Sequence, residues 1–304
     1  MSNKIALKVN ELNAMTHVQL VEDERVEQKF IQLYNAFHGS EMGEQIYNKE
    51  KFNFLKLVQE NSELSKCTKL SLYGCFLDVA YNGLSLEQGS KPHAYMLPYN
   101  VNTGTKENPK WEKRASLSIT GYGELVKRIR AGHIKHADNP VVVYASDEFT
   151  IGTGSGGTLV EYKAVRPITN KTIVACFMRM VKNDGSVDFA ILEQDDFKRL
   201  AEYSKKKNKG VANALYTSNG GQIDKGFLIA KTIKHAFSTY PKIKIGDFSG
   251  FQALEVGEDE VKIDYGIQDT EAEEVNGQAF GEQPEDNEEP ETVTFESDDE
   301  EETF

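Results

Sequence analysis

Apolar residues recur every three or four positions through the first third of the chain, which is the spacing of one helix face. The stretches with this pattern, each predicted to form an amphipathic helix, are residues 23–37, 41–60 and 69–82. The third stretch stops at Asn82-Gly83, a pair that commonly ends helices. Residues 1–22 are only weakly patterned, and we expect a mobile N-terminal segment there.

Beyond residue 90 the period changes from helical spacing to alternation. Residues 93–101 and 114–121 alternate like two paired strands, and a short helix is predicted over residues 123–131. Further strand patterns and then two helices follow, at residues 141–145, 148–151, 158–166, 172–181, 187–191, 194–206 and 225–240. This order predicts an α+β fold in which helices flank a mostly antiparallel sheet. Residues 23–250 are enough to bury a core as one large domain or two small ones.

The charge of the chain is divided between a basic body and an acidic tail. Residues 251–304 hold 21 Asp/Glu and one basic residue, Lys262, a net charge of −20. The chain has 35 Lys/Arg and 48 Asp/Glu, so 34 and 27 remain in residues 1–250, a net charge of +7. The total of −13 therefore conceals a body whose charge suits a polyanionic partner.

The acidic tail, residues 251–304, is poor in large apolar residues, and we expect it to be disordered. Three roles are open for it: a solvating tail, an internal mimic of nucleic acid that occupies a basic groove, and a docking tip for a partner. The third rests on the last residues, which end in Phe304 like the acidic tips of bacterial single-stranded DNA-binding proteins. Thr303 stands where those tips carry a proline.

No group of residues in the sequence has the pattern that bond chemistry requires. The glycine-rich run 152–157 lacks the Gly-Lys-Ser/Thr end of a P-loop and leads into a strand pattern, so a hairpin turn is favoured. Asp195-Asp196 begins a predicted helix, where acids complement the helix dipole. The histidines and cysteines lack metal-site spacing. We therefore expect a non-enzymatic protein without nucleotide hydrolysis or a resident metal. Without a signal-peptide run or a long apolar stretch, we also expect it to be soluble, intracellular and away from membranes.

Basic residues gather after residue 110, because residues 110–250 hold 23 Lys/Arg and 14 Asp/Glu. Cations interleaved with aromatic side chains favour a groove that follows a phosphate backbone and stacks bases, whereas a solvated helix face is the plainer reading of any single cluster. Trp111 suits base stacking or anchoring of its loop, and both are open. The candidate DNA-binding residues are Arg114, Lys127, Arg128, Arg130, Lys231 and Lys234 as phosphate contacts, Tyr122 near the backbone or a base, Trp111, and more weakly Lys205 and Lys207.

Four sequence blocks occur in an order that resembles a known family. They are residues 72–84 (LYGCFLDVAYNGL), 94–99 (AYMLPY), 114–132 (RASLSITGYGELVKRIRAG) and 230–237 (AKTIKHAF). Together they resemble the RecT family of phage and prophage single-strand annealing proteins, over roughly residues 23–245. Two departures stand out. The turn before Gly123 does not read Gly-Tyr-Lys-Gly, and the loop from Asn102 to Lys113 is longer than in compact members.

The resemblance implies an ATP-independent protein that binds single-stranded DNA, assembles into rings or filaments and anneals complementary strands in recombination. It implies a strand-strand-strand-helix core with DNA in a positively charged groove, and no cofactor beyond Mg²⁺ as a counterion of the DNA. Its implied partners are single-stranded DNA, the annealed duplex intermediate, further copies of the chain, a 5′→3′ exonuclease and a host single-stranded DNA-binding protein. Its implied location is the bacterial cytoplasm. A plain single-stranded DNA-coating protein with an acidic regulatory tail is the alternative.

Overall fold

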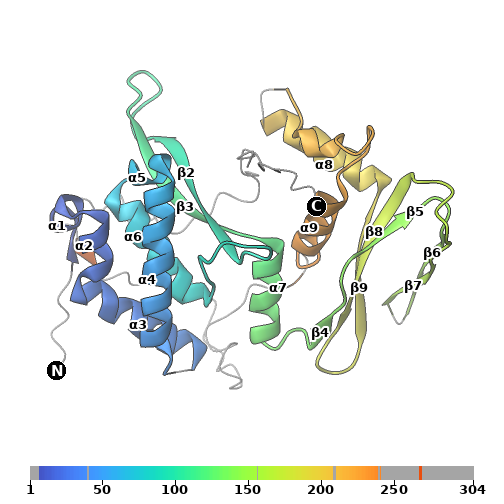
Figure 1. The fold of residues 1–304 in the computed structure, drawn as a ribbon, viewed down its shortest axis with the longest axis horizontal. Coiled ribbons are helices and arrows are strands. Elements are labelled where there is room, and N and C mark those ends of the chain that lie inside the picture. Colours follow the sequence, from blue (N-terminus) through green and yellow to red (C-terminus); the bar gives the residue numbers. More distant parts are fainter. Residues whose placement is uncertain are drawn as a thin grey trace, which may run out of the picture.

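The computed structural model describes residues 7–39, 41–155, 157–207, 210–238, 240 and 267–268. Helices gather in an N-terminal lobe and an antiparallel sheet dominates a second lobe, with one short helix, α7 (Gly121–Arg130), between them (Figure 1). The predicted α+β class is confirmed. The other helices are α1 (Val9–Ala14), α2 (His17–Glu22), α3 (Glu24–His38), α4 (Gly43–Glu60), α5 (Ser62–Ser65), α6 (Lys69–Asn82), α8 (Gln194–Lys207) and α9 (Lys225–His235).

The N-terminal lobe is built around an aromatic cluster contributed by α3, α4 and α6. The rings of Phe30 and Phe76 have centroids 4.8 Å apart, and Phe54 lies 5.3 Å from Phe76. All three side chains are fully buried. Burial of such large rings is the main stabilising contribution to a lobe of this size. α6 lies at the centre of the lobe because its apolar residues cover most of its circumference.

Residues 7–22 differ from the expectation of a mobile segment. They form a short strand, β1 (Leu7–Lys8), followed by α1 and α2, and Leu12, Leu20 and Val21 are fully buried. Thr16 caps α2 through a capping box with Gln19. Each helix spans only six residues, which is too short for the repeating stripe that marks a helix in a sequence.

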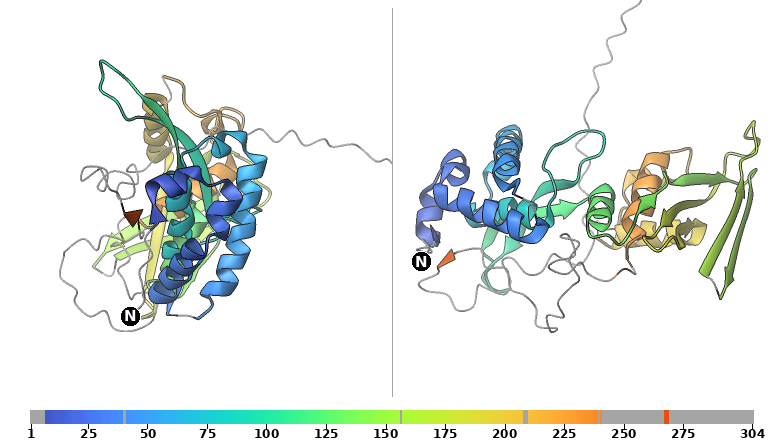
Figure 2. Two further views of the ribbon diagram at one scale, coloured as in Figure 1. Left: turned by 90° about the vertical axis from the view of Figure 1, so that its left-hand side faces the viewer. Right: turned by 90° about the horizontal axis from the view of Figure 1, so that it is seen from below.

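A long hairpin of two antiparallel strands, β2 (Ala94–Asn102) and β3 (Trp111–Ile119), packs one face on α6. The buried side chains of that inner face alternate along both strands and are Ala94, Met96, Ala115 and Leu117. The hairpin end projects beyond the helices (Figures 1 and 2). Among the described residues two strands, not the three of a strand-strand-strand-helix core, form this sheet before α7.

The second lobe holds a four-stranded sheet and a separate hairpin that packs against it. The sheet consists of β4 (His136–Ala137), β5 (Val141–Tyr144), β8 (Ile173–Val181) and β9 (Val187–Glu193). The hairpin consists of β6 (Glu148–Gly154) and β7 (Gly157–Lys163). The ring centroid of its Phe149 lies 5.7 Å from that of Phe177 in β8. The glycine-rich run lies at the end of this hairpin, as its sequence predicts.

Most of the acidic tail lies outside the described residues, so the expectation of disorder over 251–304 is not tested there. Ile267 and Gln268 form β10, which pairs in parallel with β1. The two residues at the start of the described chain are therefore joined to a segment well past α9.

Candidate nucleic-acid interface

The face of the β2–β3 hairpin that points away from α6 carries tyrosines beside a cation. Side chains alternate along a strand, so the residues of this face lie between the buried residues of the inner face. Tyr99 of β2 lies directly opposite Arg114 of β3. Tyr95 and Tyr99 are both half-buried. We call this the outer face: Tyr95, Leu97, Tyr99 and Val101 of β2 and Glu112, Arg114, Ser116 and Ser118 of β3.

Arg114 is held only loosely by its own chain. Its Nη2 atom lies 3.3 Å from a carboxylate oxygen of Glu112, and the two side chains are 30% and 46% exposed. Exposed pairs of this kind contribute little, about 0–1 kcal/mol. A phosphate group can therefore replace Glu112 as the partner of Arg114 at small cost.

A second aromatic group lies where the hairpin meets α7. The ring of Tyr122, in the first turn of α7, lies 5.6 Å from that of His93, and the ammonium of Lys91 lies 5.5 Å from the Tyr122 ring centroid. Burial, and then the charge of Arg130, lower the pKa of His93, so its ring is neutral at physiological pH. Lys91 and His93 were not among the residues predicted from the sequence, since Lys91 stands outside the basic clusters.

Thr120 fixes the start of α7 and so positions Tyr122. Its hydroxyl accepts a hydrogen bond from the backbone N–H of Gly123 at 2.9 Å and donates to the carbonyl of Pro92 at 2.6 Å. A Cβ atom on Gly123 would lie 2.1 Å from the carbonyl oxygen of His93. Glycine is therefore required where α7 crosses the start of β2.

Lys127 and Arg128 of α7 face neighbouring residues rather than open solvent. Arg128 is 7% exposed, with its guanidinium carbon 5.9 Å and 5.8 Å from the ring centroids of Phe237 and Tyr240. Lys127 lies 3.7 Å from Glu124, and burial lowers the pKa of its ammonium. These residues connect α7 to the second lobe and to its own first turn.

Arg130 is exposed, yet one of its guanidinium nitrogens donates to the carbonyl of Gly83, which ends α6. The last turn of a helix presents carbonyl oxygens that lack intrahelical donors, and a cation there is favourable. Arg130 therefore ties the end of α7 to the end of α6.

α9 shows the same pattern of enclosed charge. Lys231 is 9% exposed, and its ammonium lies 5.0 Å from the Phe227 ring centroid. Lys234 is half-buried at the point where α9 meets Gly121 of α7. Burial leaves little of Arg128 or Lys231 open to a phosphate, because long basic side chains also pack their stems and charges against aromatic rings. Their role as phosphate contacts stays a prediction.

Lys198, Arg199 and Lys205 of α8 are exposed but locally paired. Lys205 lies 2.6 Å from Glu202, and Arg199 lies 3.0 Å from Asp196. Asp195 and Asp196 lie in the first turn of α8, as predicted for acids at a helix start. Nothing is described of the Lys207 side chain. The softer candidates Lys205 and Lys207 thus lie on a helix separate from the outer face.

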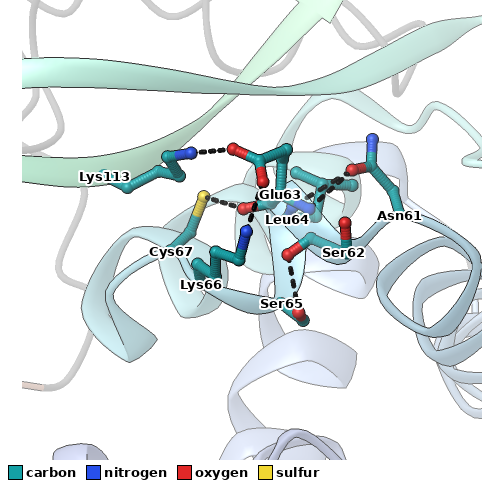
Figure 3. A network of polar contacts seen from close by, with 8 residues as sticks. All are labelled: Asn61, Ser62, Glu63, Leu64, Ser65, Lys66, Cys67 and Lys113. Carbon is teal, nitrogen blue, oxygen red and sulfur yellow. Dashed lines mark hydrogen bonds and ion pairs between the residues drawn. The ribbon is translucent and has the colours of Figure 1, made fainter.

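Towards the loop end of the hairpin, Glu63 of α5 joins Lys66 to Lys113 of β3 (Figure 3). The two ammonium groups lower the pKa of Glu63 to about 2. Lys113 lies on the inner face and is committed to this contact. Trp111, two residues closer to the hairpin end, is 66% exposed.

In the described part of the chain, metal clusters, cysteine pairs and membrane-spanning helices are all absent. It contains no cluster of three or more His, Cys, Asp or Glu side chains arranged to hold a metal ion. Its three cysteines are buried and unpaired with one another. None of the described helices combines the length and apolarity needed to cross a bilayer.

The model of the RecT family matches residues 49–226, which is more than half of the chain. The matched segment runs from α4 to the start of α9 and contains the whole outer face, Tyr122 and α7. No curated protein matches the chain. By this match the chain belongs to the RecT family of single-strand annealing proteins.

Proposed function

We propose that this single-strand annealing protein holds one DNA strand along the outer face of the β2–β3 hairpin and past Tyr122, and pairs it with a complementary strand without nucleotide hydrolysis. The observation that carries the proposal is the cross-strand pair of Tyr99 and Arg114, which sets an aromatic ring beside a cation. Base stacking on aromatic rings and phosphate contacts from cations are the two sequence-independent ways to hold a single strand.

Each side chain has a role that follows from its position. Arg114 and Lys91 are phosphate contacts, since neither is enclosed by other side chains to the extent of Arg128 or Lys231. Tyr95, Tyr99 and Tyr122 are surfaces for bases. Lys127, Arg128, Arg130, Lys231 and Lys234 set the geometry of the junction between α6, α7 and α9 on which Tyr122 is carried.

Annealing on such a surface requires no bond chemistry. The protein lowers the entropic cost of pairing by keeping a strand extended, while neutralised phosphates allow a second polyanion to approach. Mg²⁺ acts only as a counterion of the DNA. Further copies of the chain assemble as a ring or filament, with a 5′→3′ exonuclease and a host single-stranded DNA-binding protein as partners in the bacterial cytoplasm.

A strand-coating protein is the second candidate, because the outer face binds one strand equally well in either case. The test is the pairing of two complementary labelled oligonucleotides, each precoated with the protein, in the absence of nucleotide. We expect pairing faster than for the same oligonucleotides alone. Pairing slower than the uncatalysed reaction would identify a coating protein.

A further inference from the structure

The end of the β2–β3 hairpin presents the chain's single tryptophan, Trp111, to solvent. Trp111 is 66% exposed and pairs with Asn102 at the last register position of the hairpin. Asn102 closes the loop beyond it, because its Oδ1 atom accepts from the backbone N–H groups of Gly104 and Lys110, each at 3.0 Å. The loop is thus anchored by Asn102, and Trp111 is not needed as its anchor.

Trp111 lies on the opposite face of the hairpin from the outer-face residues. It is three residues from Arg114, and an odd separation along a strand reverses the side-chain direction. It shares its face with Lys113, whose ammonium is held by Glu63. A DNA strand that lies on the outer face is therefore separated from the Trp111 indole by the hairpin itself.

The charge around Trp111 suits a polyanion. Lys106 and Lys110 are exposed, and neither forms an ion pair with any residue that the structure describes. An exposed indole with two solvated ammonium groups is the combination that stacks bases and contacts their phosphates.

We propose that Trp111, with Lys106 and Lys110, contacts the second, incoming single strand during annealing. The proposal rests on the proposed function, in which the first strand occupies the outer face. The hairpin then separates two strand-binding surfaces, with Arg114 and the tyrosines on one side and Trp111 on the other. Trp111 would hold the incoming strand about 10 Å along the hairpin from Arg114, which contacts the first strand, since three residues of a β-strand span that distance.

Trp111 reports on its own contacts, because it supplies all of the indole fluorescence of the chain. The full chain is first saturated with one labelled oligonucleotide, and a second strand is then added, either complementary or identical to the first. We expect quenching of Trp111 on addition of the complementary strand. Quenching completed by the first strand would place Trp111 in the first-strand site and overturn the proposal. Emission that changes with protein concentration alone would identify a contact between copies of the chain instead.

Substitutions give a readout that separates this proposal from the proposed function. Trp111→Ala is expected to slow pairing about fivefold or more while first-strand affinity is unchanged, and Trp111→Phe to restore much of the rate. Leu159→Ala is the matched control, because Leu159 is 69% exposed on the other hairpin. Pairing by Trp111→Ala at the wild-type rate would overturn this proposal and leave the proposed function intact. Failure of the wild-type chain to pair strands would contradict the proposed function itself.

Discussion

A Cβ atom built on Gly121 would lie 2.9 Å from the carbonyl oxygen of Ala230, so the first turn of α7 rests directly on the backbone of α9. This contact carries Tyr122, the next residue, and fixes where its ring is presented. The position of one candidate DNA-binding side chain is therefore set by the packing of two helix backbones.

Gly121→Ala is expected to destabilise the protein by about 1–3 kcal/mol, because the added methyl group meets backbone atoms that have no rotamer to escape into. The midpoint of urea unfolding measures the change. Gly89→Ala is the control, since a Cβ atom there has no neighbour within 4 Å. Equal midpoints for the two variants would show that α7 and α9 are less closely packed than described.

Arg130→Ala is expected to lower stability by about 1 kcal/mol through loss of the hydrogen bond to the Gly83 carbonyl. Lys135→Ala removes an exposed cation from the loop that follows α7 and serves as the control. If Arg130 instead contacts phosphate alone, its removal will flatten the salt dependence of DNA binding without changing the unfolding midpoint. That outcome would contradict the structural role.

Acid pH is expected to destabilise the N-terminal half of the chain. Burial is the first cause that lowers the pKa values of His17, His38 and His93 below the ordinary 6.5. Below pH 6.5 the unfolded chain binds protons that the folded chain still excludes, so stability falls as the pH drops from 6.5 towards the lowered values and is unaffected well above pH 6.5.

Urea midpoints measured on both sides of pH 6.5 test this dependence. His38→Gln should make the fall shallower, because one of the three partly buried rings is removed. His136→Gln is the control, since the His136 side chain is 63% exposed. A fall that is equally steep in His38→Gln would exclude His38 as a contributor.

Tyr122→Ala is expected to weaken single-strand binding about fivefold or more through loss of one stacked base, whereas Tyr122→Phe keeps the ring and the affinity. Fluorescence anisotropy of a labelled oligonucleotide measures both. Tyr203→Ala removes a half-exposed tyrosine from α8 and should leave affinity unchanged. Equal losses in the Tyr122 and Tyr203 variants would argue for a binding surface that extends over α8.

The long, strongly periodic elements could be predicted from the sequence alone. The helix expected over residues 69–82 and α6 have the same bounds, and the hairpin of β2 and β3 follows its alternation. Residues 7–22 were missed because helices of six residues show less than two turns of any stripe.

The candidate site was predictable only in part, because the burial of a cation depends on residues that are distant in the sequence. A cation on a helix looks the same in a sequence whether it faces solvent or the rings of a distant segment. Arg128 meets Phe237 and Tyr240, more than a hundred residues away along the chain, and only the fold brings them together. Lys91 was not predicted because its relevance comes from Tyr122, which the first turn of α7 places beside it.

The salt dependence of single-strand affinity tests the central claim most directly, with Lys91→Ala/Arg114→Ala compared with the wild-type chain. The control is Lys163→Ala/Lys171→Ala, which removes two exposed cations from the second lobe. If Lys91 and Arg114 are phosphate contacts, the slope of log affinity against log salt should become shallower by about 1.4 in the first variant and stay unchanged in the control. A wild-type slope in the first variant would contradict the placement of DNA on the outer face.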